Sequence, residues 1–153
     1  MNSVTWSTVA EFAGLAMIIG VLIFVVFHLS QNRTYRYGLL LAFVPVFLVL
    51  WINLAVGIIG EPEDPANLMY IAVPAVAVIG AIVVQFEASG MARALTLAAC
   101  VQGLVAVVTL LTARSEPARW LWSLLVLNAV LVALWMGSAA LFRKAAEARI
   151  KEE

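Results

Sequence analysis

The chain alternates long apolar runs with short polar connections, and this alternation is its most regular feature. A helix needs about 20 apolar residues to cross ~30 Å of hydrocarbon. Five runs come close to that length. We therefore predict five membrane-spanning α-helices, at about residues 9–29, 38–60, 65–86, 94–111 and 120–142.

The connections between these runs are short, so we expect one transmembrane helix-bundle domain over residues 1–153. Polar connections are expected at residues 30–37, 87–93 and 112–119. The tail, residues 143–153, contains helix-forming residues but is too charged to enter lipid. Pro45 and Pro74 lie inside the second and third spans, where proline is able to break a helix.

Composition supports a membrane protein of the all-α class. The chain is 65% hydrophobic and 12% charged, whereas a soluble domain has roughly 45–50% apolar and about 25% charged residues. The net charge of zero argues against nucleic acid as a partner, because such binding needs a basic face. One cysteine, Cys100, and one histidine, His28, exclude an internal disulfide and metal sites built from several such ligands. We predict no metal, no cofactor and no catalytic residue.

The positively charged residues predict the orientation of the bundle, because cytoplasmic loops carry the excess of Lys and Arg. In a five-span arrangement, one side holds Arg114 and Arg119. The other side holds seven bases: Arg33, Arg36, Arg93, Arg143, Lys144, Arg149 and Lys151. The N-terminus is therefore expected outside and the C-terminus in the cytoplasm.

The connection between the second and third spans holds three acids and no base. Asp64 stands directly before Pro65, the arrangement of an N-cap followed by proline at the first helical position. Glu61 and Glu63 then lie near the positive end of a helix. Carboxylates also suit hard cations such as Ca²⁺, so an external ion site is the alternative. We favour capping.

Polar side chains inside the spans are the second group of candidates, since they are costly in hydrocarbon. At about 1.5 Å per residue, Asn53 lies roughly 10 Å from the outer end of its span, Asn128 roughly 13 Å and Gln102 roughly 15 Å. Glu11 lies near the outer end of the first span. These four residues are predicted to converge in the outer half of the membrane. They form either a hydrated pocket or only interhelical hydrogen bonds, and we favour the latter.

Small residues repeat every fourth position at Ala129, Ala133 and Gly137, and again at Ala99 and Gly103. Such stripes allow close helix approach. They predict packing faces, within the chain or with a partner. Cys100 is predicted to be a small packing residue.

Four segments resemble a group of small bacterial inner-membrane proteins of unknown function: WINLAVGIIG (51–60), DPANLMY (64–70), GMARAL (90–95) and LNAVLVALWMGSAALFRKAA (127–146). Members of that group usually have four spans, and this chain adds the segment 1–37. The resemblance implies a multi-pass location in the inner membrane and supplies no catalytic residue.

The sequence lacks a nucleophile–base pair or phosphate-binding loop, so we predict that the protein is not an enzyme. We expect an accessory, assembly or regulatory subunit that packs against membrane proteins, itself or lipid. The alternative is a small oligomeric transporter or channel with a polar pocket in the outer half of the membrane.

Overall fold

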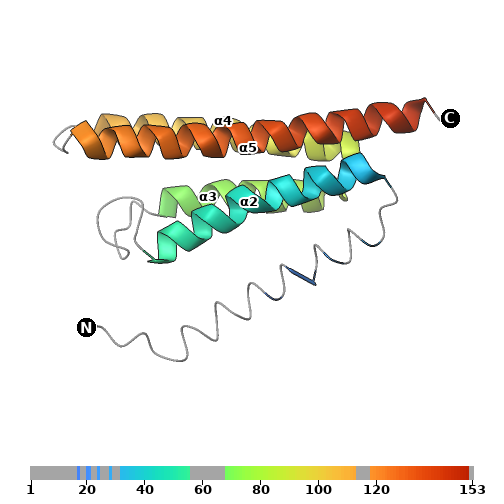
Figure 1. Cartoon of the computed structure of the whole chain (residues 1–153), viewed down its shortest axis with the longest axis horizontal. Coiled ribbons are helices and arrows are strands. Elements are labelled where there is room, and N and C mark those ends of the chain that lie inside the picture. Colours follow the sequence, from blue (N-terminus) through green and yellow to red (C-terminus); the bar gives the residue numbers. More distant parts are fainter. Residues whose placement is uncertain are drawn as a thin grey trace.

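The computed structural model describes residues 32–55, 68–112 and 118–151, together with residues 17, 20, 21, 24 and 28. These residues form four α-helices and, within the described ranges, no strand. The all-α prediction is confirmed for this part of the chain. The helices are α2 (Arg33–Ala55), α3 (Leu68–Val83), α4 (Ala88–Thr112) and α5 (Ala118–Ile150) (Figure 1).

The predicted boundaries need correction where polar residues turn out to be helical. Helix α2 begins at Arg33 rather than at Gly38, because Asn32 caps it. The Asn32 Oδ1 atom accepts hydrogen bonds from the backbone N–H groups of Thr34 (2.9 Å) and Tyr35 (3.3 Å), which satisfies two donors that a helix start leaves open. Helix α5 continues through most of the tail, to Ile150, as its helix-forming residues predict.

The connection between α3 and α4 is much shorter than predicted, and α4 begins at Ala88 rather than at 94. The N–H of Phe86 bonds to the Ala81 carbonyl and that of Gln85 to the Ile82 carbonyl, each at 3.0 Å. These two bonds form a Schellman motif. Gln85 and Phe86 have φ angles of 51° and 58°, a left-handed conformation that non-glycine residues adopt at a cost of about 1–2 kcal/mol each. The two helices are therefore joined by a tight reversal.

Three of the described helices are long and apolar enough to cross a membrane: 33–53, 88–112 and 119–150. Helix α3 is shorter, with 16 residues, or roughly 24 Å. Pro45 and Pro74 interrupt neither α2 nor α3. The predicted first span, 9–29, and the acidic connection lie outside the described residues, apart from residues 17, 20, 21, 24 and 28.

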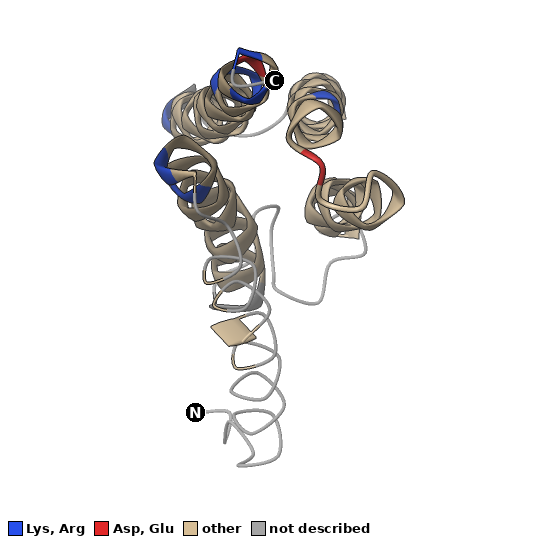
Figure 2. Ribbon diagram, turned by 90° about the vertical axis from the view of Figure 1, so that its right-hand side faces the viewer, with Lys and Arg blue, Asp and Glu red and all other residues tan. Residues whose placement is uncertain are grey.

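Successive helices run antiparallel and form a bundle in which α5 contacts α4 and α2, while α3 packs mainly on α4 (Figures 1 and 2). One end of the bundle is fixed by Tyr35. Its hydroxyl donates to the Phe86 carbonyl at 2.6 Å, and its ring meets that of Phe142 edge-on, with the ring centroids 4.8 Å apart. The start of α2, the end of α3 and the last third of α5 therefore meet at this end.

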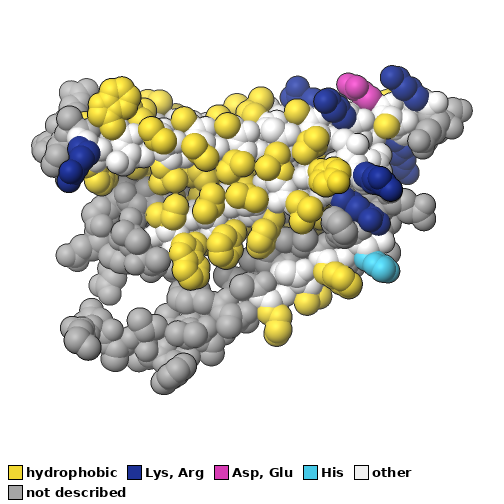
Figure 3. Space-filling model, viewed as in Figure 1, with side chains coloured by type: hydrophobic (Ala, Val, Ile, Leu, Met, Phe, Trp, Pro, Cys, Tyr) yellow, Lys and Arg dark blue, Asp and Glu magenta, His cyan; other side chains and the backbone are white. Residues whose placement is uncertain are grey.

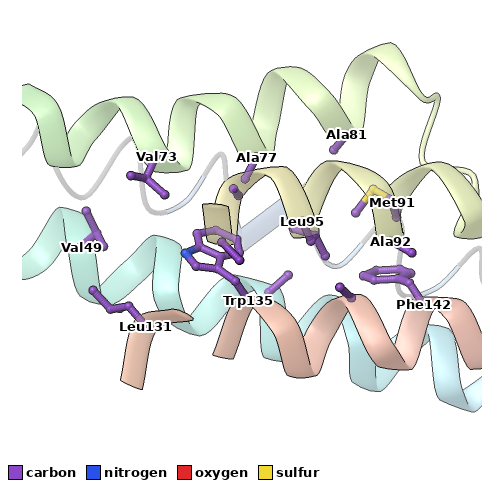
Figure 4. Close-up of a cluster of buried hydrophobic side chains, with 14 of the residues drawn as sticks. Val49, Val73, Ala77, Ala81, Met91, Ala92, Leu95, Leu131, Trp135 and Phe142 are labelled. Carbon is purple, nitrogen blue, oxygen red and sulfur yellow. The ribbon is translucent and has the colours of Figure 1, made fainter. Parts of the chain in front are cut away.

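The core is apolar and draws side chains from all four helices (Figure 4). Trp135 of α5 is its largest fully buried side chain. Close approach of α3 and α4 depends on Gly80, where an added Cβ would lie 2.8 Å from the Ala94 Cβ. Real Cβ atoms essentially never come that close, so only glycine permits this spacing.

The outside of the bundle is also rich in large apolar side chains (Figure 3). Val83 and Leu104 are among the most exposed of them. Lys and Arg side chains gather mainly at the end where α5 terminates (Figure 3). An apolar exterior with charges at the ends is the distribution expected of helices surrounded by hydrocarbon.

Candidate functional site

The candidate site is a group of four buried polar side chains in the half of the bundle away from the basic end. We call it the polar cluster: Tyr70 of α3, Gln102 and Thr109 of α4, and Asn128 of α5. Gln102, Tyr70 and Thr109 are 0% exposed and Asn128 is 3% exposed. In an apolar interior, such groups need hydrogen-bond partners.

Hydrogen bonds connect the cluster in one direction. The Gln102 Nε2 atom donates to Asn128 Oδ1 at 2.7 Å. The Asn128 Nδ2 atom donates to the Tyr70 hydroxyl at 3.2 Å, and that hydroxyl donates to Thr109 Oγ1 at 3.3 Å. Thr109 Oγ1 in turn donates to the Val105 carbonyl at 2.9 Å. The chain of donors thus starts at Gln102 and ends on a backbone acceptor.

The orientation of both amides follows from one backbone carbonyl. Asn128 Nδ2 also lies 2.9 Å from the carbonyl oxygen of Leu124, and a carbonyl oxygen only accepts. The amino group of Asn128 must therefore face Leu124, which leaves its oxygen to face Gln102. Gln102 must then present its own amino group, so its Oε1 atom points away from Asn128.

Helix periodicity explains why these residues meet. Gln102 and Thr109 are seven positions apart, or about two turns, and so lie on the same face of α4. Asn128 comes from the facing helix α5, and Tyr70 reaches the cluster from the first turn of α3. The cluster therefore joins three helices.

Two buried polar atoms have no hydrogen-bond partner among the described residues: Gln102 Oε1 and Trp135 Nε1. One is an acceptor and the other a donor. Trp135 lies seven residues after Asn128 and is likewise buried in the core. Each orphaned group lowers stability, by roughly 1–3 kcal/mol in proteins generally.

The structure brings Gln102 and Asn128 together, as their predicted depths require. Asn53 is buried near the end of α2 and has an interaction of its own. Glu11, Glu61, Glu63 and Asp64 lie outside the described residues. Interhelical hydrogen bonding stays the favoured prediction for these residues, and a hydrated pocket stays its alternative.

Sequence reasoning missed Tyr70 and Thr109 as members of the cluster. A tyrosine near a helix end reads as an interfacial residue, and threonine in a helix satisfies its hydroxyl on its own backbone. The available signal was spacing, because Thr109 follows the predicted Gln102 by two helical turns.

A second candidate is the outward face of α5, which we define by Trp122, Val126, Ala129, Val130 and Ala133. All five residues are exposed, and their spacing places them on one side of the helix. Trp122, Val126 and Val130 also line a shallow depression, together with Arg119, Ser123 and Leu127.

The residues of the small-residue stripes therefore differ in where they face. Gly137 packs within the chain, because an added Cβ would lie 3.1 Å from Leu41 Cδ2, whereas Ala129 and Ala133 face outward. Gly103 has nothing within 4 Å of an added Cβ. Cys100 is exposed, so it does not pack inside this chain, and a packing role against a partner stays a prediction.

No group of three or more His, Cys, Asp or Glu side chains able to hold a metal ion occurs in the described part of the chain. Comparison with protein-family models, curated proteins and solved structures gave no match.

Proposed function

We propose that this protein is a multi-pass protein of a bacterial inner membrane that acts as an accessory, assembly or regulatory subunit. In this proposal it has five spans, with the N-terminus outside and the C-terminus in the cytoplasm, and it binds a helix of a partner membrane protein through the outward face of α5. The family resemblance of residues 51–146 remains a prediction that fits this location.

The proposed orientation is supported by where the bases lie in space. Arg33 and Arg36 begin α2, Arg93 lies early in α4, and Arg143 lies late in α5. These segments meet at the end of the bundle that carries Tyr35, Phe86 and Phe142. Arg119 lies at the opposite end, at the start of α5.

The proposed mode of action rests on one observation. On the outward face of α5, exposed alanines lie next to a shallow depression. Small residues allow two helix backbones to approach closely. Ala129 and Ala133 are not used for packing inside the chain, since both are exposed. The neighbouring depression offers room for a side chain of the partner helix. Trp122, 68% exposed, lines the depression and would cover the partner's side chain there.

The test is purification in mild detergent, followed by mass spectrometry of the subunits that co-purify. We expect a second membrane protein in stoichiometric amount with the wild type. Ala133→Leu should lose it, because the larger side chain separates the helices. Ala75→Leu, which enlarges an exposed alanine on α3, should retain it. Equal recovery with both variants, or a pure homo-oligomer in each case, would contradict the proposal.

The alternative, a small oligomeric transporter or channel, is favoured by one observation. Gln102 Oε1 is buried without a partner among the described residues, and such an atom could accept a hydrogen bond from a solute. Two features weigh against it. The cluster side chains are almost fully buried, and α2 and α3 continue through their prolines, whereas transporter sites are typically built from broken helices.

Reconstituted vesicles test this alternative directly. Flux of an ion or small polar solute that Gln102→Leu abolishes would support the transporter and replace our proposal. We expect no flux above that of protein-free vesicles.

A further inference from the structure

We propose that the surface where α4 and α5 meet at the basic end, which we call the α4–α5 seam, binds one anionic phospholipid, with Arg93 and Arg143 on its phosphate and an acyl chain along the seam. This inference rests on the proposed membrane location but not on the partner helix.

The headgroup position follows from where the two arginines lie. Arg93 directly precedes the apolar run of α4, and Arg143 directly follows that of α5. Both therefore lie at the level where hydrocarbon gives way to headgroups. The structure brings the two helices together there, since Arg143 Nη2 lies 3.3 Å from Thr96 Oγ1. Thr96 is one turn along α4 from Arg93, on the adjacent side of the helix.

The two arginines are available to an external anion. Both are exposed, and within the described residues neither forms an ion pair with a carboxylate. Lys144 adds a further exposed base, and Glu147, one turn beyond Arg143, is the acid on the same stretch of α5. Basic pockets between transmembrane helices are recognised sites for anionic headgroups, and arginine matches phosphate in a bidentate geometry.

The acyl-chain path follows from small or exposed residues below the headgroup. On α4, Thr96 is followed at helical spacing by Cys100, Gly103 and Val107. Cys100 and Val107 are exposed, and an added Cβ at Gly103 would meet nothing within 4 Å.

The facing wall is formed by α5. Met136 lies seven residues before Arg143, so it shares the face of Arg143 on the helix, and it is exposed. The path from Thr96 to Val107 is roughly 16 Å long, about half of a ~30 Å hydrocarbon core. One acyl chain in one leaflet has this reach.

The test measures binding of phosphatidylglycerol and phosphatidylcholine to the full-length purified protein, by native mass spectrometry and by the shift in melting temperature. We expect phosphatidylglycerol to bind and to raise Tm, and phosphatidylcholine to do so much less. The double variant Arg93→Gln/Arg143→Gln should lose roughly 30-fold in affinity, because each base near an anionic surface contributes about 1 kcal/mol. Arg149→Gln/Lys151→Gln, which removes two bases beyond the seam, is the matched control.

A second variant tests the acyl chain separately. An added Cβ at Gly103 meets nothing within 4 Å, so Gly103→Leu should fold, cover part of the seam and weaken lipid binding at least tenfold. Inorganic phosphate should not displace the lipid at millimolar concentration.

Three results would overturn the proposal: equal binding of both lipids, unchanged affinity in the arginine double variant, or displacement by inorganic phosphate alone. Unchanged affinity in Gly103→Leu would overturn the acyl-chain path. Absence of a co-purifying subunit with the wild type, while these lipid measurements come out as expected, would count only against the proposed function.

Discussion

Asn128 is the residue on which the polar cluster depends most, and its replacement by leucine gives the sharpest test of the cluster's role. Asn128 accepts from Gln102 and donates to Tyr70, so the substitution removes two interhelical hydrogen bonds. At an average of about 0.6 kcal/mol each in membrane proteins, these bonds contribute about 1.2 kcal/mol.

The larger effect falls on Gln102. Its Oε1 atom already has no partner among the described residues, and Asn128→Leu would leave its Nε2 atom without one as well. An orphaned buried amide costs roughly 1–3 kcal/mol. We therefore expect Asn128→Leu to lower the free energy of unfolding by about 2–4 kcal/mol.

A double-mutant cycle separates this reasoning from a simple loss of packing. Gln102→Met keeps much of the side-chain volume and removes the amide. In that background, Asn128→Leu leaves no stranded amide, and its cost should fall by about 1–3 kcal/mol. Unfolding in mixed detergent micelles, followed by far-UV circular dichroism, measures each variant.

Two outcomes would refute the account. One is a cost for Asn128→Leu that is the same in both backgrounds, since the two residues would then act independently. The other is a neutral effect of Asn128→Leu in the wild type, which would show that the cluster contributes little to folding. Tyr70→Phe is a milder control: it keeps the buried ring and removes only the hydroxyl that receives the Asn128 bond.

Three further predictions concern other parts of the chain. Single cysteines in a cysteine-free background should react with an impermeant reagent in intact cells at Ser3 but not at Ser30, and the reverse pattern would invert the proposed orientation. If Asp64 is an N-cap, Asp64→Ala should lower the free energy of unfolding by about 0.5–2 kcal/mol and Asp64→Asn by much less. Calcium should then have no effect on Tm. A Tm that rises with calcium in the wild type alone would favour the ion site. Gly90→Ala should lower the free energy of unfolding by about 1–3 kcal/mol, because the added Cβ would overlap Val84. Gly103→Ala is the control: its Cβ enters open space, so this variant should be neutral or stabilising in the same unfolding measurements.

The sequence alone determined the helical class and the depth of the polar residues. The apolar runs are near 20 residues long. A backbone segment of this kind in lipid forms a helix, because every N–H and C=O group must find its hydrogen-bond partner within the segment. Depth follows from a fixed rise per residue, so Gln102 and Asn128 could be placed at similar levels before any contact was known. Helix ends were less predictable, because they depend on local capping. Asn32 extends α2 over residues that composition alone assigned to a loop.

Only the tertiary structure decided which face of each helix turns inward. In a soluble protein, the apolar stripe of a helix marks the buried side, but helices that are apolar all round carry no such mark. The small-residue stripe therefore predicted packing but not its location: Ala129 and Ala133 face outward, while Gly137 on the same stripe packs on Leu41. The position of Tyr70 in the polar cluster was not predictable either, because the sequence does not show which side of α3 faces α4. Its partner became definable only once α3 lay beside α4, where the hydroxyl reaches Thr109 and Asn128.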